Sequence, residues 1–408
     1  MIGRGWRRLR GTGRQMKRSG LREAAIGGGW IILLLLAATV FGQGKGKPSF
    51  PKLEKKGYSK AAVCGRCHTL IYQSWKDTLH ARSLVDPIFD TAYLEAYRMT
   101  QGKAKTFCLA CHAPTTQFTK DFEIRQEITS EGITCDFCHT LKDVKLAKQG
   151  LHELKIETGL VKWGTHGQEK APNHEVAASK LYEDSLICAG CHEYVNPKGV
   201  VVLGTYSEWS AGFYRKQGTP CQRCHMPISR QEEGYLTEGG LIARKEINLH
   251  DIAGGSSVPQ LKKMLKVGIA SVERLGGRVR VVVEITNHGA GHRIPTGLPT
   301  KRLVLTLKAT TAQGKSFVAE RSYRKVLLNE RGEEITRDVD AFLNAARLSS
   351  DNRIEPKETR REEFFFFVPR GTEVVINAQV VYEYKPRVID QVDTVVDLAR
   401  DERVFNAR

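Results

Sequence analysis

The ten cysteines of the chain fall into one repeated pattern, Cys-X-X-Cys-His, and none is left over. The five copies are Cys64/Cys67/His68, Cys108/Cys111/His112, Cys135/Cys138/His139, Cys188/Cys191/His192 and Cys221/Cys224/His225. Two thiols three residues apart can form thioethers with the two vinyl groups of a haem, and the adjacent histidine then lies under the iron as its proximal ligand. The pattern therefore predicts five covalently bound haem c groups.

Two other uses of these cysteines fit the pattern less well. Structural zinc takes Cys-X-X-Cys units in pairs, whereas five is an odd number, and zinc does not explain a histidine after every second cysteine. Disulfides within such pairs would close only very small loops and would constrain the chain little.

Seven further histidines are available as distal ligands on the other side of the iron: His80, His152, His166, His174, His250, His288 and His292. Electron-transfer haems generally take a second strong ligand. We expect His80, His174, His250 and His292 to serve as distal metal ligands. His152, His166 and His288 have no assigned role, and the pairing of distal histidines with irons stays open.

The segment that carries these motifs contains too little chain per cofactor for a conventional apolar core. Its five motifs lie between residues 64 and 225. We therefore predict a loop-rich, mainly helical pentahaem domain over residues 63–262, in which the haems form the core. Short helices are expected around residues 70–81, 86–99 and 206–216.

The periodicity changes after residue 262, where apolar and polar residues alternate as in strands, for example from Val279 to Ile285 and from Val374 to Tyr382. The run 363–367 is expected to be a strand buried on both sides. We predict an α+β chain whose residues 263–408 form an immunoglobulin-like β-sandwich. Its two histidines, His288 and His292, share one loop, which could supply an axial ligand to the haem domain.

The first 42 residues are expected to direct export. Basic residues precede an apolar run from Ala24 to Gly42, as in a signal peptide or an N-terminal membrane anchor, and residues 43–62 follow as a linker. We expect a periplasmic, membrane-anchored or secreted protein. The formal charge of +18 owes much to this leader, and no aromatic-interleaved basic stripe suggests nucleic-acid binding.

The sequence around the motifs resembles that of a known family. Segments such as CGRCHTLIYQSWKDTLHARS, EGITCDFCHT and GHRIPTG are similar to those of multihaem cytochromes of the c-552/c-554 type. The resemblance implies that His80, His174, His250 and His292 are distal ligands. It also implies electron transfer between quinol-linked membrane systems and periplasmic or extracellular acceptors, and some relatives assemble into haem filaments.

Three functions follow from these expectations. The leading prediction is an electron carrier that has no catalytic residues and works with redox partner proteins. The second is an oxidoreductase with one open haem acting on a small nitrogen or sulfur compound. The third is a subunit of a haem filament, which would make the chain a homo-oligomer.

Overall fold

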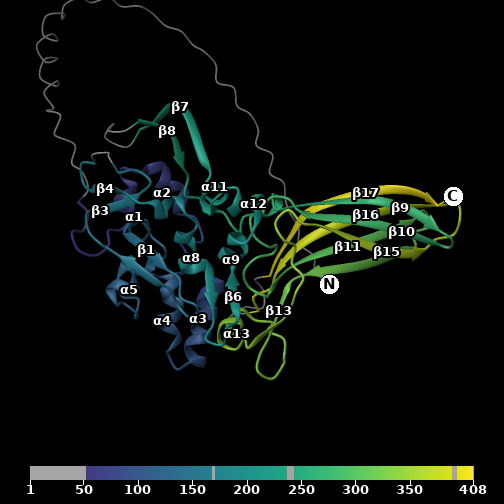
Figure 1. Cartoon of the computed structure of the whole chain (residues 1–408), viewed down its shortest axis with the longest axis horizontal. Coiled ribbons are helices and arrows are strands. Elements are labelled where there is room, and N and C mark those ends of the chain that lie inside the picture. The colour runs from purple at the N-terminus through teal and green to yellow at the C-terminus, as the bar shows by residue number, and fades with distance from the viewer. Residues whose placement is uncertain (1–51, 168–170, 237–242, 388–392, 408) are drawn as a thin grey trace, which may run out of the picture. The chain divides into compact units, whose positions relative to one another are not determined.

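The computed structural model describes residues 52–167, 171–236, 243–387 and 393–407 (Figure 1). Residues 50–408 form one unit. The predicted leader lies outside the described residues. No helix in the described part of the chain is long and apolar enough to cross a membrane.

The part of the chain that carries the Cys-X-X-Cys-His motifs consists of short helices and two-stranded sheets. The helices are α1 (Ala61–Gly65), α2 (Thr69–Trp75), α3 (Pro87–Met99), α4 (Ala104–His112), α5 (Thr116–Thr119), α6 (Glu127–Ser130), α7 (Cys135–Cys138), η1 (Lys180–Glu183), α8 (Leu186–His192), α9 (Thr205–Ser210), α10 (Phe213–Lys216), α11 (Cys221–His225) and α12 (Val258–Lys262). The paired strands are β1 (Leu141–Lys145) with β2 (Glu153–Ile156), β3 (Val161–Gly164) with β4 (Glu175–Ala178), β5 (Glu193–Val195) with β6 (Val201–Gly204), and β7 (Ile228–Leu236) with β8 (Ala243–Asn248).

The predicted helices are present, but two are shorter than expected. Helix α3 starts as predicted, because Pro87 occupies its first turn and the Asp86 carboxylate caps the backbone N–H groups of Ile88 and Phe89. Helix α2 ends at Trp75, whose indole N–H donates to the carbonyl of Ile133, and the chain continues in hydrogen-bonded turns. The third predicted helix is divided into α9 and α10.

Apolar packing in this part of the chain is divided among small clusters. One joins Tyr58, Ile128 and Phe137, and another joins Leu84, Leu109 and Ala113. Such clusters are much smaller than the core of the strands that follow. This distribution agrees with the expectation that a second component fills the interior of the motif-bearing part.

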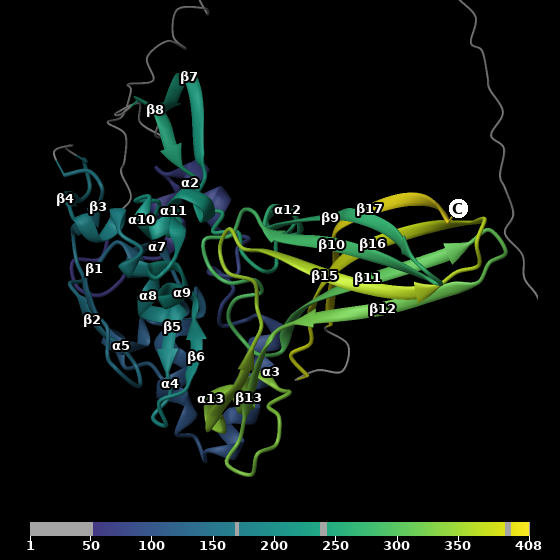
Figure 2. The ribbon, with the colours of Figure 1, turned by 45° about the vertical axis from the view of Figure 1, so that its right-hand side comes forward.

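Residues 265–407 contain two larger antiparallel sheets. One has the order β15-β10-β9 and the other β12-β11-β16-β17 (Figure 2). Their strands are β9 (Leu265–Leu275), β10 (Arg278–Asn287), β11 (Lys301–Thr311), β12 (Ser316–Tyr323), β15 (Thr359–Phe367), β16 (Thr372–Tyr384) and β17 (Thr394–Ala407). Inward side chains of both sheets form one core, with Ile285 from β10, Leu305 from β11 and Ile376 from β16 fully buried.

The prediction that residues 363–367 are buried on both sides is wrong. Phe364 and Phe366 are 2% and 4% exposed, whereas Phe365 and Phe367 are 45% and 69% exposed. Strand β15 belongs to a sheet that packs one face on the shared core, so its alternate side chains look outward.

A segment between β12 and β15 leaves the two sheets and packs against the motif-bearing part. It contains β13 (Lys325–Leu328), α13 (Asp338–Leu343) and β14 (Arg347–Asp351). Leu327 and Ala341 share an apolar cluster with Val202, and the side-chain amide of Asn196 donates to the carbonyl of Ala345 at 2.7 Å. The packing therefore crosses the boundary predicted after residue 262.

Candidate functional site

Each of the five motifs lies on a short helix or helical turn. In the first motif the backbone N–H groups of Cys67 and His68 both donate to the carbonyl of Cys64, and in the third the N–H of His139 donates to that of Cys135. Residues three and four apart along a helical turn lie on the same face. The turn therefore directs two thiols and one imidazole toward the same side of the chain, as covalent haem attachment requires.

Four of the five motif histidines face a second histidine. The ring centres of His68 and His174 are 6.3 Å apart, those of His192 and His80 6.1 Å, those of His139 and His250 6.2 Å, and those of His225 and His292 6.4 Å. The structure thus brings all four predicted distal histidines to motif histidines.

This separation fits an iron between the two rings. An imidazole nitrogen binds a transition metal at about 2.0–2.1 Å. Adding the ring radius of about 1.1 Å on each side gives roughly 6.3 Å between ring centres. The paired residues therefore fit a haem iron that receives one axial ligand from each side.

The distal histidines come from four different parts of the chain. His80 lies in the turns between α2 and α3, His174 directly precedes β4, and His250 follows β8. His292 comes from the loop after β10, so this sheet contributes to a site in the motif-bearing part.

Backbone carbonyls orient the rings. The Nδ1 atoms of His139, His225 and His292 lie 2.6, 2.5 and 2.9 Å from the carbonyl oxygens of Trp163, Ala253 and Arg293. A carbonyl oxygen only accepts, so each Nδ1 carries the proton and Nε2 keeps its lone pair. A lone pair on Nε2 is what an axial metal ligand needs.

The protonation of these histidines also suits metal binding. Burial lowers the pKa of His80 to about 3, and it lowers the pKa values of His192, His250 and His292 to about 4. The rings are therefore neutral at pH 7, which is the form that binds a metal.

Comparisons with known proteins agree with this geometry. Residues 63–140 match the family model described as cytochrome c554 and c-prime. This match spans the first three Cys-X-X-Cys-His motifs and supports a multihaem cytochrome c of the c554-like family, with haem c as the cofactor and electron transfer as the general role.

The fold of the cytochrome is similar to that of a penta-heme cytochrome c552 from Thermochromatium tepidum. The two share 22% identity with a TM-score of 0.67, and the match covers 85% of this chain and 99% of the other. A β-glucosidase from Kluyveromyces marxianus matches at 9% identity over 35% of this chain and 14% of the other, with a TM-score of 0.19. The structural-genomics target SoR45 matches at 9% identity over 34% of this chain and 84% of the other, with a TM-score of 0.18. No curated protein matches the cytochrome significantly.

His112, in the second motif, does not share the arrangement of the other four. Its Nδ1 lies 2.9 Å from the carbonyl oxygen of Ser83, and its ring stacks on Phe89 with centres 3.7 Å apart. No second histidine faces His112 among the described residues. Among the described residues, the second motif therefore offers one imidazole that could hold an iron, where each of the other motifs offers two.

The three histidines without a predicted role lie outside these pairs. In His152, Nδ1 accepts from the N–H of Ala147 at 3.0 Å and Nε2 lies 2.9 Å from the carbonyl of Glu193. Both nitrogens of His152 are thus engaged with backbone. His166 and His288 are exposed.

Contacts between cysteines show which motifs are neighbours in the cytochrome. None of the ten is disulfide-bonded. The thiols of Cys64 and Cys135, of Cys111 and Cys191, and of Cys188 and Cys221 lie close enough to shift one another's pKa values. Cys138 is also close enough to Cys188 and Cys191 to raise their pKa values, although hydrogen bonding and burial are the larger causes. The fourth motif therefore adjoins the second, third and fifth, and the first adjoins the third.

A buried group of charges fixes the loop that carries His292, and sequence analysis missed it. The guanidinium of Arg353 lies 2.7 Å from the carboxylate of Glu208, and the two side chains are 4% and 8% exposed. Glu208 also accepts from the Thr296 hydroxyl at 2.8 Å, and Arg353 donates to the carbonyl of Pro295 at 3.1 Å. Nothing in the sequence around Glu208 distinguishes it from a surface residue.

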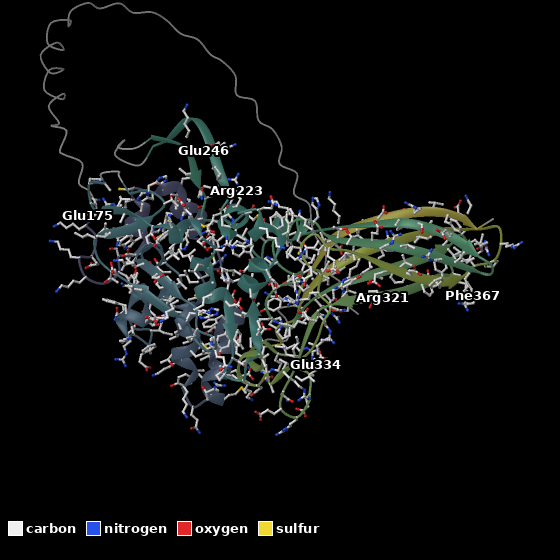
Figure 3. All side chains as sticks on the ribbon, in the orientation of Figure 1. Glu175, Arg223, Glu246, Arg321, Glu334 and Phe367 are labelled. Carbon is white, nitrogen blue, oxygen red and sulfur yellow. The ribbon has the colours of Figure 1, made fainter. Side chains whose placement is uncertain are left out.

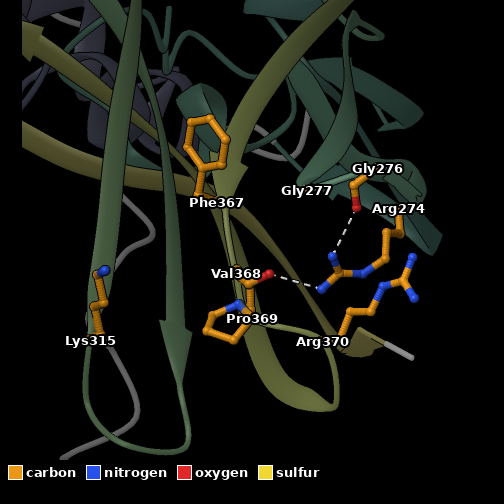
Figure 4. A pocket seen from close by; sticks show the side chains of 8 residues that line it. All are labelled: Arg274, Gly276, Gly277, Lys315, Phe367, Val368, Pro369 and Arg370. Carbon is orange, nitrogen blue, oxygen red and sulfur yellow. Dashed lines mark hydrogen bonds between the residues drawn. The ribbon is translucent and has the colours of Figure 1, made fainter.

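Two surface hollows differ in their relation to the motifs. The larger, about 670 Å³, is lined by Arg274, Lys315, Phe367 and Arg370 at the turn end of β9 and β10 (Figures 3 and 4). Strand β10 runs from this end toward the loop with His292, so the hollow lies at the opposite end of the sheet. The smaller, about 220 Å³, is bordered by Cys111 and His152. Only the smaller one adjoins a motif.

Proposed function

We propose that the cytochrome carries electrons through five covalently attached haems, four of them held between two histidines. The observation that carries this proposal is the spacing of the four histidine pairs, 6.1–6.4 Å between ring centres. The thioether cysteines are Cys64, Cys67, Cys108, Cys111, Cys135, Cys138, Cys188, Cys191, Cys221 and Cys224. The metal ligands are His68 with His174, His192 with His80, His139 with His250, His225 with His292, and His112.

Each haem would supply a one-electron iron couple. The neutral imidazoles, oriented by backbone carbonyls, would hold the iron from both sides in the oxidised and the reduced state. Little rearrangement then accompanies a change of charge, which suits rapid electron transfer. The thiol contacts support closely spaced centres that run from the first motif through the third to the fourth, with the second and fifth beside the fourth.

The remaining parts of the chain have roles that follow from this proposal. Residues 1–42 act as a signal peptide or membrane anchor and residues 43–62 as a linker to the haem domain, residues 63–262. Residues 263–408 form an immunoglobulin-like sandwich that delivers His292. The exported cytochrome receives electrons from membrane-linked donors and passes them to periplasmic or extracellular acceptors.

The single histidine at the second motif favours a second candidate function. An iron held by His112 alone would have a free axial position. Such an iron could bind a small nitrogen or sulfur compound and make the protein an oxidoreductase. Within the described residues, the 220 Å³ hollow bordered by Cys111 adjoins this motif.

Electron paramagnetic resonance of the oxidised holoprotein, with a pyridine haemochrome count, tests both candidates. The expected result is five haems per chain, with four low-spin sites and one high-spin site. Fewer than five haems would overturn the pentahaem proposal. Five low-spin sites would remove the basis of the second candidate, whereas turnover of nitrite or sulfite by the reduced protein would support it.

A further inference from the structure

The larger of the two surface hollows, about 670 Å³, lies where the ends of the two large sheets meet (Figure 4). Arg274 near the end of β9 and Arg370 after β15 approach it from one sheet, and Lys315 in the turn between β11 and β12 approaches it from the other. Every charged residue that lines it in the described part of the chain is a cation. We therefore call it the basic hollow.

The positive charge of the basic hollow is not neutralised by the sheets around it. Arg370 and Lys315 are exposed, and their side chains form no ion pair or hydrogen bond within the described residues. Two acidic residues of the three-stranded sheet, Glu273 and Glu363, pair with Arg280 instead. Like charges that lie together in a concave site produce a positive potential, which attracts anions.

The backbone holds Arg274 in a fixed position at this site. Its Nη1 and Nη2 atoms donate to the carbonyl oxygens of Gly276 and Val368 at 3.0 and 2.9 Å (Figure 4). Each Nη atom carries two N–H groups, so one on each is left for a ligand. A guanidinium of this kind suits a carboxylate, which arginine can bind through two parallel hydrogen bonds.

An exposed aromatic ring borders the basic hollow. Phe367 is 69% exposed, and the guanidinium of Arg278, opposite it on β10, lies 5.1 Å from the ring centre. Phe365 on the same outer face is 45% exposed. Arginine and aromatic residues are enriched at protein–protein interfaces. The ring offers a peptide an apolar contact that a free phosphate ion cannot use.

The basic hollow is remote from the histidine pair that the sheet helps to form. The 10 residues of β10 separate this end of the sheet from the loop that carries His292, which corresponds to about 30 Å. A partner bound at the hollow would therefore hold the cytochrome at a distance from His225 and His292.

We propose that the basic hollow docks a carboxylate-rich segment of a partner protein and so anchors the cytochrome by this end of its sheets. The inference does not depend on the proposed ligation of the haems. It adds a binding partner that is distinct from the electron donor and acceptor.

The test is fluorescence anisotropy of a fluorescein-labelled hexaglutamate peptide, titrated with the oxidised holoprotein at low salt. The wild type is expected to bind the peptide, and Arg370→Glu or Lys315→Glu should weaken binding by roughly tenfold, because a cation of the hollow becomes an anion. The matched control is Arg400→Glu. It changes the net charge equally at an exposed position in the middle of β17 and should alter the affinity by less than about twofold.

Other outcomes would overturn the proposal. A wild type that does not bind the peptide would show that the hollow takes no carboxylate segment. Equal weakening by Arg370→Glu and Arg400→Glu would show that only the net charge attracts the peptide. Binding to phosphatidylglycerol vesicles that falls in Arg370→Glu, without such an effect on the peptide, would assign the hollow to a membrane surface. A haem count and spin-state spectrum of each variant equal to those of the wild type would show that the proposed function stands in any of these cases.

Discussion

At the scale of single residues, the chemistry of the cytochrome depends on which histidine nitrogen is free. The carbonyls of Trp163, Ala253 and Arg293 each accept from an Nδ1–H and leave Nε2 for the iron. The exposed His288, four residues from His292, lies outside the pairs. Proximity in sequence is therefore not enough to make a ligand.

Replacing His292 by alanine removes the distal imidazole that faces His225. We expect one of the four low-spin signals to be lost and the high-spin signal to grow from about one fifth to about two fifths of the iron. Electron paramagnetic resonance of the oxidised protein measures this change. His288→Gln is the control in the same loop and should leave the spectrum unchanged, and an unchanged spectrum in His292→Ala would contradict the assignment.

The low pKa values of the distal histidines predict a pH dependence. His250 and His292 have pKa values of about 4 in the folded chain, against about 6.5 when unfolded. The unfolded chain therefore binds more protons between about pH 6.5 and pH 4, so stability falls as the pH falls through this window and is level above it. Denaturant unfolding followed at the Soret band should show this slope; a midpoint independent of pH would argue against it.

The motif cysteines and the distal histidines were predictable because their chemistry is local or follows from the need of an iron for ligands. Glu208 was not, because its importance comes from burial and from Arg353, a partner far away in sequence. A single sequence does not show that a charged residue is buried.

At the scale of elements, the loop between β10 and β11 is held on two sides. The side-chain amide of Asn287 donates to the carbonyls of His292 and Ile354, and its oxygen accepts from the N–H of Ala290. The ion pair of Arg353 and Glu208 fixes the other side. These contacts hold the loop so that His292 reaches His225.

Replacing Arg353 by methionine would leave Glu208 as a buried, unpaired carboxylate. We expect a loss of about 3–5 kcal/mol in the free energy of unfolding and a high-spin fraction at the fifth motif, because the His292 loop loosens. Chemical denaturation and spin-state spectra measure the two effects. Arg361→Gln breaks an exposed pair with Glu284 and should cost less than about 1 kcal/mol; equal losses in both variants would refute the role of the buried pair.

The alternation of apolar and polar residues predicted the strands of the two sheets well. The ends of the helices and the buried faces of the strands could not be predicted without the tertiary structure. Helix α2 ends where Trp75 bonds to Ile133, a residue 58 positions away. The alternating exposure of Phe364–Phe367 arises because only one face of the β15 sheet packs on the core. No periodic pattern in the sequence predicts that β13, α13 and β14 leave the sheets and pack against the motif-bearing part. Their partners, such as Val202, lie in another region of the chain.

At the scale of the whole molecule, the fourth motif occupies the centre of the array. Its cysteines lie close to Cys221 of the fifth motif, to Cys111 of the second and to Cys138 of the third. Electrons that pass between the first or third motif and the second or fifth would therefore cross the fourth.

Replacing Cys188 and Cys191 together by alanine tests this arrangement. We expect four haems per chain, and reduction by a partner or dithionite should change from one kinetic phase to two, because the first and third sites lose their connection to the second and fifth. Stopped-flow absorbance measures the phases. The matched control, Cys108→Ala with Cys111→Ala, removes a terminal site and should keep a single phase; a single phase in both variants would show that the fourth motif is not the connection.

The four histidine pairs have a mechanical consequence. On the proposed ligation each iron closes a ring of chain, from residue 68 to 174, from 80 to 192, from 139 to 250 and from 225 to 292. Each ring overlaps the next, so opening any of the first three leaves most of its chain enclosed by the others. The last ring cannot close until residue 292 has folded into place. The rings therefore close in order from the N-terminal side. In a chain that has not finished folding, the iron at His225 would still lack its second histidine.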